Sequence, residues 1–214
     1  MCIRDRLGVD TIHDQMEPLG FGRLTGIDLQ GEVKGILPST EWKRKAYKRP
    51  EQKKWYAGET ISLGIGQGYN TFTMLQVASA LATVVSDGRR FQPRLVREVE
   101  DVVTRERRSI SGQALAAVPI KPDHAAIIRE AMHGVTVEGT GTRVFAGAPY
   151  LSGGKTGTAQ AVTLRQNEKY NAAKLADYQR DHSLYEAFAP VDQPRVALAV
   201  IVENAGFGAD AAAP

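Results

Sequence analysis

The sequence predicts an α+β domain in which helices come first and flank an antiparallel sheet built mainly from the last third of the chain. Apolar residues recur at helical spacing through the first part of the 214 residues, whereas the last third holds short runs rich in small and β-branched residues. Two of these runs, residues 184–189 and 195–203, are joined by a turn-length link, which is typical of antiparallel strands. The composition, 43% hydrophobic and 24% charged, is that of an ordinary globular protein.

Three segments are expected to be helical. Residues 8–20 carry apolar side chains at helical spacing and end at Gly20. Residues 71–87 carry a continuous apolar stripe, and the glycine that follows is placed to end the helix in the left-handed conformation. A third helix begins at Pro122, a residue favoured in a first turn. It is expected to bury a stripe formed by Ile127, Ile128, Ala131, Met132 and Val135.

The segments between these helices are expected to be turns, loops and one short hairpin. Glycines and a proline over 19–38 indicate a series of turns. Residues 42–55 form a basic run with interleaved aromatic residues, which could contact nucleic acid or anionic lipid. A solvated surface loop is the preferred interpretation, because no nucleic-acid-binding motif accompanies this short run. Residues 94–103 alternate enough to predict a strand or hairpin.

The last third is expected to supply the sheet. Residues 155–161 are flanked by glycines and are rich in small and β-branched residues. The run 195–203 has almost no polar interruption, so it is expected to be a central strand buried on both faces. Residues 167–181 are predicted to be a polar insert with some helical character.

Charge and composition exclude several classes of function. The net charge of +3 is too small to indicate nucleic-acid binding by itself. No apolar run reaches the roughly 18 residues of a membrane helix, and the first residues lack the apolar core of a secretory signal. A single cysteine cannot form an intramolecular disulfide, and four histidines without ligand spacing predict neither a metal site nor a cofactor.

The segment Gly153-Gly-Lys-Thr-Gly-Thr158 is the most informative motif. A phosphate-binding loop would need glycine at position 149, where the chain has Pro149. The Lys-Thr-Gly triplet is instead one of three motifs of the penicillin-recognising serine acyltransferases. On an edge strand, Lys155 would place a cation beside a substrate carboxylate and Thr156 would offer a hydroxyl. Gly157 would let the substrate approach the backbone, so that the next N–H can donate to an oxyanion.

Four stretches, 19–39, 55–88, 153–160 and 182–208, resemble the class B penicillin-binding proteins, and among them the elongation-type peptidoglycan D,D-transpeptidases. Gly64-Ile-Gly-Gln-Gly68 followed by a helix is specific to these enzymes. The resemblance implies a β-lactamase/transpeptidase-like fold and an acyl-enzyme that cross-links peptidoglycan stem peptides and binds β-lactam antibiotics. It also implies that Lys155 and Thr158 are catalytic, and that Lys155, Thr156, Gly157 and Thr158 bind substrate, with the Thr158 N–H forming half of an oxyanion hole.

The sequence departs from the family pattern in one decisive way. The family's S-x-x-K and S-x-N motifs precede the segment that begins at Leu19, and neither occurs ahead of that segment in this chain. The chain is therefore expected to be an incomplete domain, inactive alone, with residues 7–214 as the C-terminal portion and residues 1–6 as a non-native N-terminus. The resemblance also implies an enzyme anchored in the bacterial inner (plasma) membrane that faces the periplasm and works with the glycosyltransferase of the elongation complex. The anchor is expected to lie outside the chain.

Two short segments imitate the missing motifs. Ser152-Gly-Gly-Lys155 matches S-x-x-K, but two glycines disfavour the helix that this motif requires, and in a strand residues three apart point to opposite faces. Ser86-Asp-Gly88 imitates a variant of S-x-N but falls where a helix is expected to end.

The alternative function is a β-lactam-binding sensor or a serine β-lactamase-like domain. Both share the Lys-Thr-Gly triplet but lack the segment from Gly22 to Gly68. A nucleotide-binding module that uses Gly-Gly-Lys-Thr is weakened by Pro149 and by the absence of a helical pattern after the motif.

Overall fold

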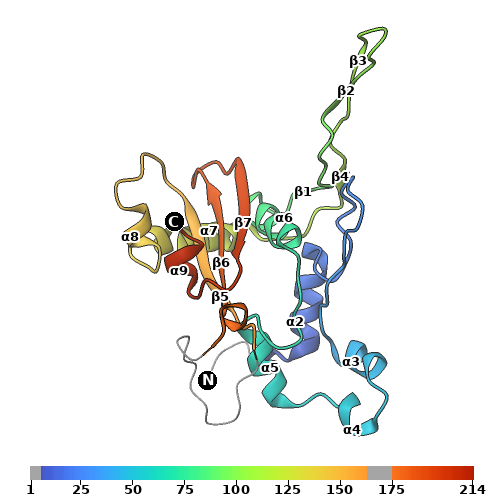
Figure 1. The fold of residues 1–214 in the computed structure, drawn as a ribbon, viewed down its shortest axis with the longest axis vertical. Helices are drawn as coiled ribbons and strands as arrows, with labels where there is room; N and C mark the ends of the chain where they lie inside the picture. The colour runs from blue at the N-terminus through green and yellow to red at the C-terminus, as the bar shows by residue number, and fades with distance from the viewer. Residues whose placement is uncertain (1–5, 163–174) are drawn as a thin grey trace. The chain divides into compact units, whose positions relative to one another are not determined.

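The computed structural model describes residues 6–162 and 175–214, which belong to two compact units (Figure 1). Unit 1 comprises the chain up to Thr83 together with Gly88–Pro119. Unit 2 comprises Val84–Asp87 and the chain from Ile120 onward. Each unit is described by itself.

Unit 1 is built from helices joined by glycine-rich turns. The predicted first helix is confirmed as α2 (Val9–Met16), which continues into the short 3₁₀ helix η1 (Glu17–Leu19) and ends at Gly20 in the left-handed conformation. Three short helices follow: α3 (Thr40–Ala46), α4 (Pro50–Lys53) and α5 (Ala57–Gly64). The predicted long helix is confirmed as α6 (Met74–Val85), whose last two residues belong to unit 2.

The core of unit 1 holds the glycine-rich connection against α6. Phe21, Leu37 and Ala80 are buried, and partly buried apolar side chains pack around them. Gln76 of α6 is also buried, and its side-chain amide donates hydrogen bonds to the carbonyl oxygens of Arg23 (2.7 Å) and Lys34 (2.9 Å). In a helix or strand these two carbonyl oxygens would accept hydrogen bonds from backbone N–H groups. In this connection, which lacks regular structure, the Gln76 side chain donates to both of them instead.

The basic run 42–55 is not a simple loop. It contains α3 and α4, and most of its side chains are exposed, as expected. Ser39 caps α3 by accepting a hydrogen bond from the Trp42 N–H (3.0 Å). Lys43 contradicts the solvated interpretation, because it is only 2% exposed.

The remaining strands of unit 1 form two small antiparallel pairs. β1 (Arg90–Phe91) pairs with β4 (Ala114–Leu115), and β2 (Glu98–Glu100) pairs with β3 (Arg107–Ser109). β2 confirms a strand within the predicted segment 94–103, whereas its partner β3 lies beyond that segment. The β2–β3 hairpin extends away from the rest of its unit (Figure 1).

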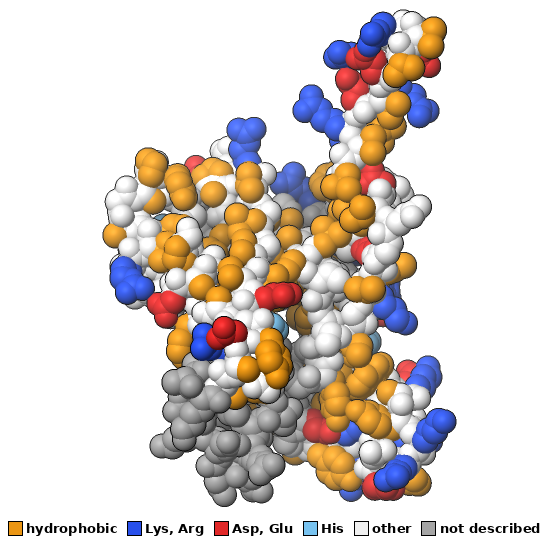
Figure 2. Space-filling model, in the orientation of Figure 1, with side chains coloured by type: hydrophobic (Ala, Val, Ile, Leu, Met, Phe, Trp, Pro, Cys, Tyr) orange, Lys and Arg blue, Asp and Glu red, His pale blue; other side chains and the backbone are white. Residues whose placement is uncertain are grey.

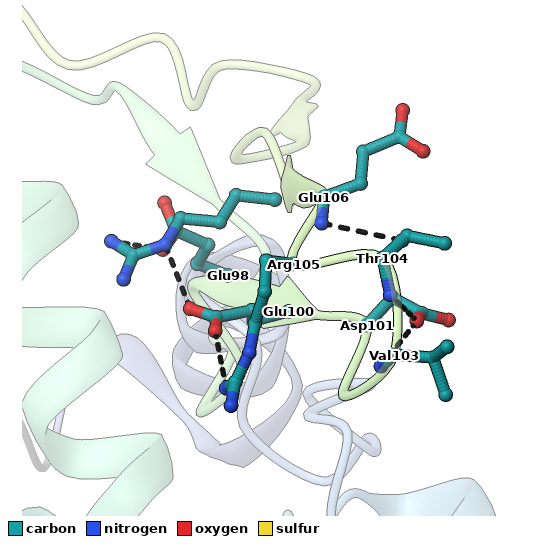
Figure 3. A network of polar contacts seen from close by, with 8 residues as sticks. Glu98, Glu100, Asp101, Val103, Thr104, Arg105 and Glu106 are labelled. Atoms are coloured by element: carbon teal, nitrogen blue, oxygen red, sulfur yellow. Dashed lines mark hydrogen bonds and ion pairs between the residues drawn. The ribbon is translucent and has the colours of Figure 1, made fainter.

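Charged side chains of both signs gather on this hairpin (Figure 2). Glu100 accepts hydrogen bonds from Arg105 (3.2 Å) and Arg107 (2.8 Å) (Figure 3). Asp101 accepts from the backbone N–H groups of Val103 and Thr104 at the turn, both at 2.8 Å. Side-chain charges and a capped turn therefore hold together a hairpin that has little apolar core of its own.

In its described residues, unit 2 holds a three-stranded antiparallel sheet and four helices. The strands are β5 (Gly153–Ala159), β6 (His182–Ala189) and β7 (Val196–Val202), in the order β5-β6-β7. The helices are α7 (Pro122–Val137), α8 (Thr142–Phe145), α9 (Gly208–Ala211) and the 3₁₀ helix η3 (Asp177–Gln179). The predicted α+β class and the hairpin formed by the last two strands are confirmed.

Helices pack on both faces of the part of this sheet that β5 and β6 form. On one face, Tyr185 and Ala187 pack with Ala212 and Ala213, which directly follow α9, and Val144 and Phe145 of α8 join them. On the other face, α7 lies against β5, since a Cβ at Gly153 would come within 3.1 Å of the His133 backbone nitrogen. β5 is thereby supported from both sides.

The prediction that the run 195–203 forms a central strand buried on both faces is wrong. β6, not β7, is the middle strand, and most β7 side chains are exposed on both faces, among them Val196 at 60%. A continuous hydrophobic run predicts a strand, but it does not predict the position of that strand in the sheet. In the described part of the chain, β7 is an edge strand.

The apolar stripe predicted for α7 is also wrong in part. Ile127 is 65% exposed and Ile128 is 39% exposed, whereas Ala125 and Thr136 are buried. Gly153 lets α7 approach this face of β5 closely, and the contact there includes the hydrogen bond from Thr136 to the Ser152 carbonyl oxygen.

The predicted polar insert lies partly outside the described residues, which omit 163–174; within the rest of it, η3 is a single 3₁₀ turn. In the part of the chain that the structure describes, no helix combines the length and apolar character needed to cross a membrane.

Candidate active site

All four predicted site residues lie on β5. The register places Lys155 opposite Glu186, Thr156 opposite Tyr185, and Thr158 opposite Ser183. Among the described residues β5 pairs with β6 alone, so its other edge is free, as the predicted chemistry requires. A substrate backbone could pair along such an edge.

The two glycines that precede Lys155 are required by the side chains of β6. A Cβ at Gly153 would lie 2.6 Å from the Phe188 ring, and a Cβ at Gly154 would come under 3.0 Å from the Tyr185 hydroxyl. Real Cβ atoms do not approach neighbours this closely. Burial of Tyr185 raises the pKa of its hydroxyl to about 12, so it stays neutral at physiological pH.

Ser152 lies directly before β5 and has a structural environment. Its side chain is buried, and its carbonyl oxygen accepts a hydrogen bond from Thr136 Oγ1 (2.8 Å) and lies 3.0 Å from His133 Nδ1. Because Gly153–Ala159 is a strand, Ser152 and Lys155 do not share the face of a helix. Ser152-Gly-Gly-Lys155 is therefore not a nucleophile motif, as predicted.

Ser86 likewise lies beyond the last residue of α6, in the turn that Gly88 closes in the left-handed conformation. The helix-end interpretation of Ser86-Asp-Gly88 is confirmed.

Lys155 is exposed, and its Nζ donates a hydrogen bond to the Thr156 carbonyl oxygen (2.6 Å). Directly opposite, burial raises the pKa of the Glu186 carboxyl, while the positive charge of Lys155 acts in the other direction. The carboxyl opposite Lys155 is therefore biased towards its neutral form.

The Thr156 hydroxyl is held by a residue that the sequence analysis missed. Thr140, in the short connection between α7 and α8, places its Oγ1 2.8 Å from Thr156 Oγ1. Sixteen residues separate the two threonines, and no motif or periodicity links them. Only the folded structure identifies Thr140 as a partner of the motif.

The strand therefore presents a cation, a positioned hydroxyl and backbone donors along one open edge. Such an arrangement can bind the carboxylate and backbone of a peptide and can stabilise an oxyanion. Among the described residues, no group of three or more His, Cys, Asp or Glu side chains could hold a metal ion.

Comparison with known proteins gives one family. A family model described as "Penicillin binding protein transpeptidase domain" matches residues 1–214. The peptidoglycan D,D-transpeptidase MrdA of Haemophilus influenzae is 41% identical over 213 residues, which are 97% of this chain and 32% of that protein. MrdA of Escherichia coli K12 is 39% identical over 207 residues, 94% of this chain and 31% of that protein.

Solved structures agree. Pseudomonas aeruginosa PBP2, in complex with WCK 5153, has a TM-score of 0.77 at 33% identity over 99% of this chain and 43% of its own. A chain of a peptidoglycan synthase complex, solved to show how polymerization and crosslinking are coordinated, has a TM-score of 0.72 at 31% identity, covering 96% of this chain and 31% of its own. This chain thus spans about a third of the length of the curated relatives it matches.

Proposed function

Because the chain belongs to the penicillin-binding protein transpeptidase domain family, we propose that it is part of a peptidoglycan D,D-transpeptidase in which residues 7–214 form the C-terminal portion of the domain. The observation that carries the proposal is Lys155-Thr-Gly-Thr158 on the free edge of β5. The family match over the whole chain supports it.

In the proposed reaction a serine outside this chain attacks the carbonyl carbon of the penultimate D-Ala of a donor stem peptide. The bond to the terminal D-Ala breaks, and that residue leaves after its nitrogen takes up a proton. The donor remains bound to the serine as an ester. An amine of a neighbouring stem peptide then attacks the ester, which forms the cross-link and returns the serine hydroxyl.

Residues of this chain bind and orient the donor in that scheme. The ammonium group of Lys155 attracts the terminal carboxylate, and the hydroxyl of Thr156, held by Thr140, adds a hydrogen bond. The N–H of Thr158 donates to the oxygen that becomes negative in the tetrahedral intermediate. Gly157 leaves the backbone open to the substrate.

A β-lactam fits the same scheme as a donor mimic. Its carboxylate would bind at Lys155, and its carbonyl oxygen would accept from the Thr158 N–H. The serine would open the ring and remain acylated, because no second amine reaches the ester.

The whole enzyme is proposed to be anchored in the inner membrane, to face the periplasm, and to work with a glycosyltransferase that makes the strands it cross-links. The likeness to a chain of a peptidoglycan synthase complex supports this partner class.

The test uses the full-length parent protein, incubated with a fluorescent penicillin and analysed on a denaturing gel. A covalent band that excess unlabelled β-lactam prevents is the expected result, with heat-denatured protein as the control. Release of D-Ala from a synthetic stem pentapeptide in the presence of an acceptor amine tests the transfer itself. A folded parent that neither takes the label nor releases D-Ala would overturn the proposal.

A further inference from the structure

We propose that Gly208 is a positioning residue that sets the orientation of the Thr158 N–H, the donor assigned above to the oxyanion hole. The inference rests on the proposed function and adds to it a residue that lies fifty positions away from the motif. It follows from how closely the first residue of α9 approaches the backbone of β5.

Gly208 lies against the peptide backbone at the centre of the motif. A Cβ built at this position would come under 3.0 Å from the carbonyl oxygens of both Gly157 and Leu184, and 2.8 Å from the Gly157 nitrogen. All three atoms belong to backbone, which cannot move aside as the end of a flexible side chain can. Any side chain at position 208 must therefore displace either α9 or β5.

Space, and not backbone conformation, is what requires glycine here. Gly208 does not have a positive φ, so any residue could adopt its backbone conformation. The contrast is Gly206, two residues earlier, which has φ +85° and no atom within 4 Å of a built Cβ.

The geometry connects Gly208 to the Thr158 N–H through one rigid group. The carbonyl of Gly157 and the N–H of Thr158 belong to the same planar peptide and point in opposite directions. The oxygens of Gly157 and Leu184 approach one common point, so the Gly157 carbonyl is directed towards β6. The Thr158 N–H then points to the free edge, where the substrate would bind.

The segment that carries Gly208 is itself fixed to β6. Ser183, which is fully buried and lies opposite Thr158, donates from Oγ to the Phe207 carbonyl oxygen (2.9 Å). The Gly206 N–H donates to the Asp181 carbonyl oxygen, also at 2.9 Å. The glycine cannot withdraw from β5 without breaking these bonds, so strain at position 208 is transmitted to the Gly157–Thr158 peptide.

The test is Gly208→Ala in the full-length parent, with the acylation rate constant and the initial binding constant for a penicillin measured separately by stopped flow. Removal of one oxyanion donor lowers a rate by about 10²–10³-fold, so partial misalignment is expected to slow acylation roughly 10–100-fold. Binding before acylation should change less than threefold or so, since Lys155 is untouched. Gly58→Ala is the matched control, because a Cβ at Gly58 meets no atom within 4 Å.

A spectroscopic measurement separates positioning from general damage to the fold. In ¹⁵N-labelled protein the Thr158 amide resonance is expected to shift in Gly208→Ala and to stay in place in Gly58→Ala. Should Gly208→Ala fail to fold, Ser183→Ala removes the anchoring hydrogen bond without adding an atom, and acylation is then expected to fall by several-fold.

The outcomes distinguish this inference from the proposed function. If the folded Gly208→Ala variant, or Ser183→Ala where the former does not fold, acylates at the wild-type rate, Gly208 does not position the donor. The transpeptidase assignment would be unaffected by that result. If the wild-type parent itself is not acylated, the proposed function fails first.

Discussion

Lys43 shows how a single residue can contradict the pattern in which it sits. The side chain lies within a basic run, yet its Nζ pairs with Glu59 and lies 5.3–5.5 Å from the ring centroids of Trp55, Tyr56 and Tyr69. Cations this close to aromatic faces are stabilised by the ring quadrupole. The sequence cannot single out Lys43 among the seven basic residues of the run, because its partner Glu59 lies sixteen residues away and on another helix.

Replacing Lys43 by alanine is expected to destabilise the chain by about 3 kcal/mol, because it leaves the Glu59 carboxylate, which is only 23% exposed, without its cationic partner. The measurement is urea unfolding of the 214-residue chain at neutral pH. Lys45→Ala is the control, since Lys45 and its partner Glu41 are mostly exposed, and it should stay within about 0.5 kcal/mol of wild type. Equal effects of the two substitutions would contradict the buried pair.

The same pair predicts a dependence on pH. Burial acts to raise the pKa of the Glu59 carboxyl, but hydrogen bonds from Lys43, Tyr69 and the Tyr56 N–H hold that pKa below its usual value. A carboxyl with a lowered folded-state pKa stabilises the fold above its unfolded pKa, and this contribution is lost as pH falls through the folded pKa. The difference in stability between wild type and Lys43→Ala should therefore narrow below about pH 4.

Lys155 carries the prediction closest to the chemistry. A charge-assisted contact is worth about 1.5–3 kcal/mol, and each 1.36 kcal/mol is tenfold in rate, so Lys155→Ala in the parent should slow acylation by penicillin roughly 10–100-fold. Lys155→Arg should retain a good part of the rate because the charge remains. Stopped-flow acylation measures both, with thermal melts to verify folding. An unchanged rate in Lys155→Ala would remove Lys155 from the site.

At the scale of elements, the sequence predicts the type of each segment better than its neighbours. The helices α2, α6 and α7 and the strands β5, β6 and β7 all occur where periodicity and β-branched runs place them. Which elements pack against each other depends instead on the shapes of the contacting surfaces. Gly153 in β5 lets α7 approach closely, and that contact cannot be derived from the helix alone.

Two substitutions in α7 test this, because the burial of Ile127 and Ala125 is the reverse of what the predicted apolar stripe implies. Ile127→Ser, at a position 65% exposed, should change the stability of the chain by less than about 0.5 kcal/mol. Ala125→Leu, at a position with no exposed surface, should cost roughly 1–3 kcal/mol by overpacking. The free energy of unfolding of both variants, measured in urea, shows whether the face with Ala125 or the face with Ile127 is buried. A larger loss for Ile127→Ser would restore the stripe predicted from periodicity.

At the scale of the whole molecule, the motif and the family could be predicted from the sequence, whereas the supports of the motif could not. Lys155 to Thr158 are contiguous, so the Lys-Thr-Gly triplet and the residue after it reveal all four. Thr140 and Gly208 reach the same strand from distant parts of the chain through a hydroxyl contact and a close backbone approach. Neither kind of contact leaves a periodic signal.

The 214-residue chain by itself is expected to form no covalent adduct with penicillin. Ser152 supplies the one S-x-x-K match in the sequence, and the strand that begins at Gly153 denies it the helical lysine partner that activates a nucleophile. Incubation with a fluorescent penicillin followed by a denaturing gel measures this, with the labelled full-length parent as positive control. A labelled band that disappears in Ser152→Ala would show that the strand geometry does not prevent acylation.

The hydrogen bonds of Gln76 predict how susceptible the chain is to proteolysis. Its amide group bonds to two carbonyl oxygens of a connection that is poor in regular structure, so one substitution can release that connection while α6 remains formed. Gln76→Glu keeps the shape but exchanges the donor for oxygens, which repel both carbonyls at neutral pH. Limited digestion with trypsin should then cut after Arg23 or Lys34 several times faster than in wild type, whereas Gln52→Glu, at an exposed position, should leave the cleavage pattern unchanged. Equal cutting of both variants would show that the connection is held by its turns, and resistance of this chain to digestion would then depend on where its glycines lie and not on one buried amide.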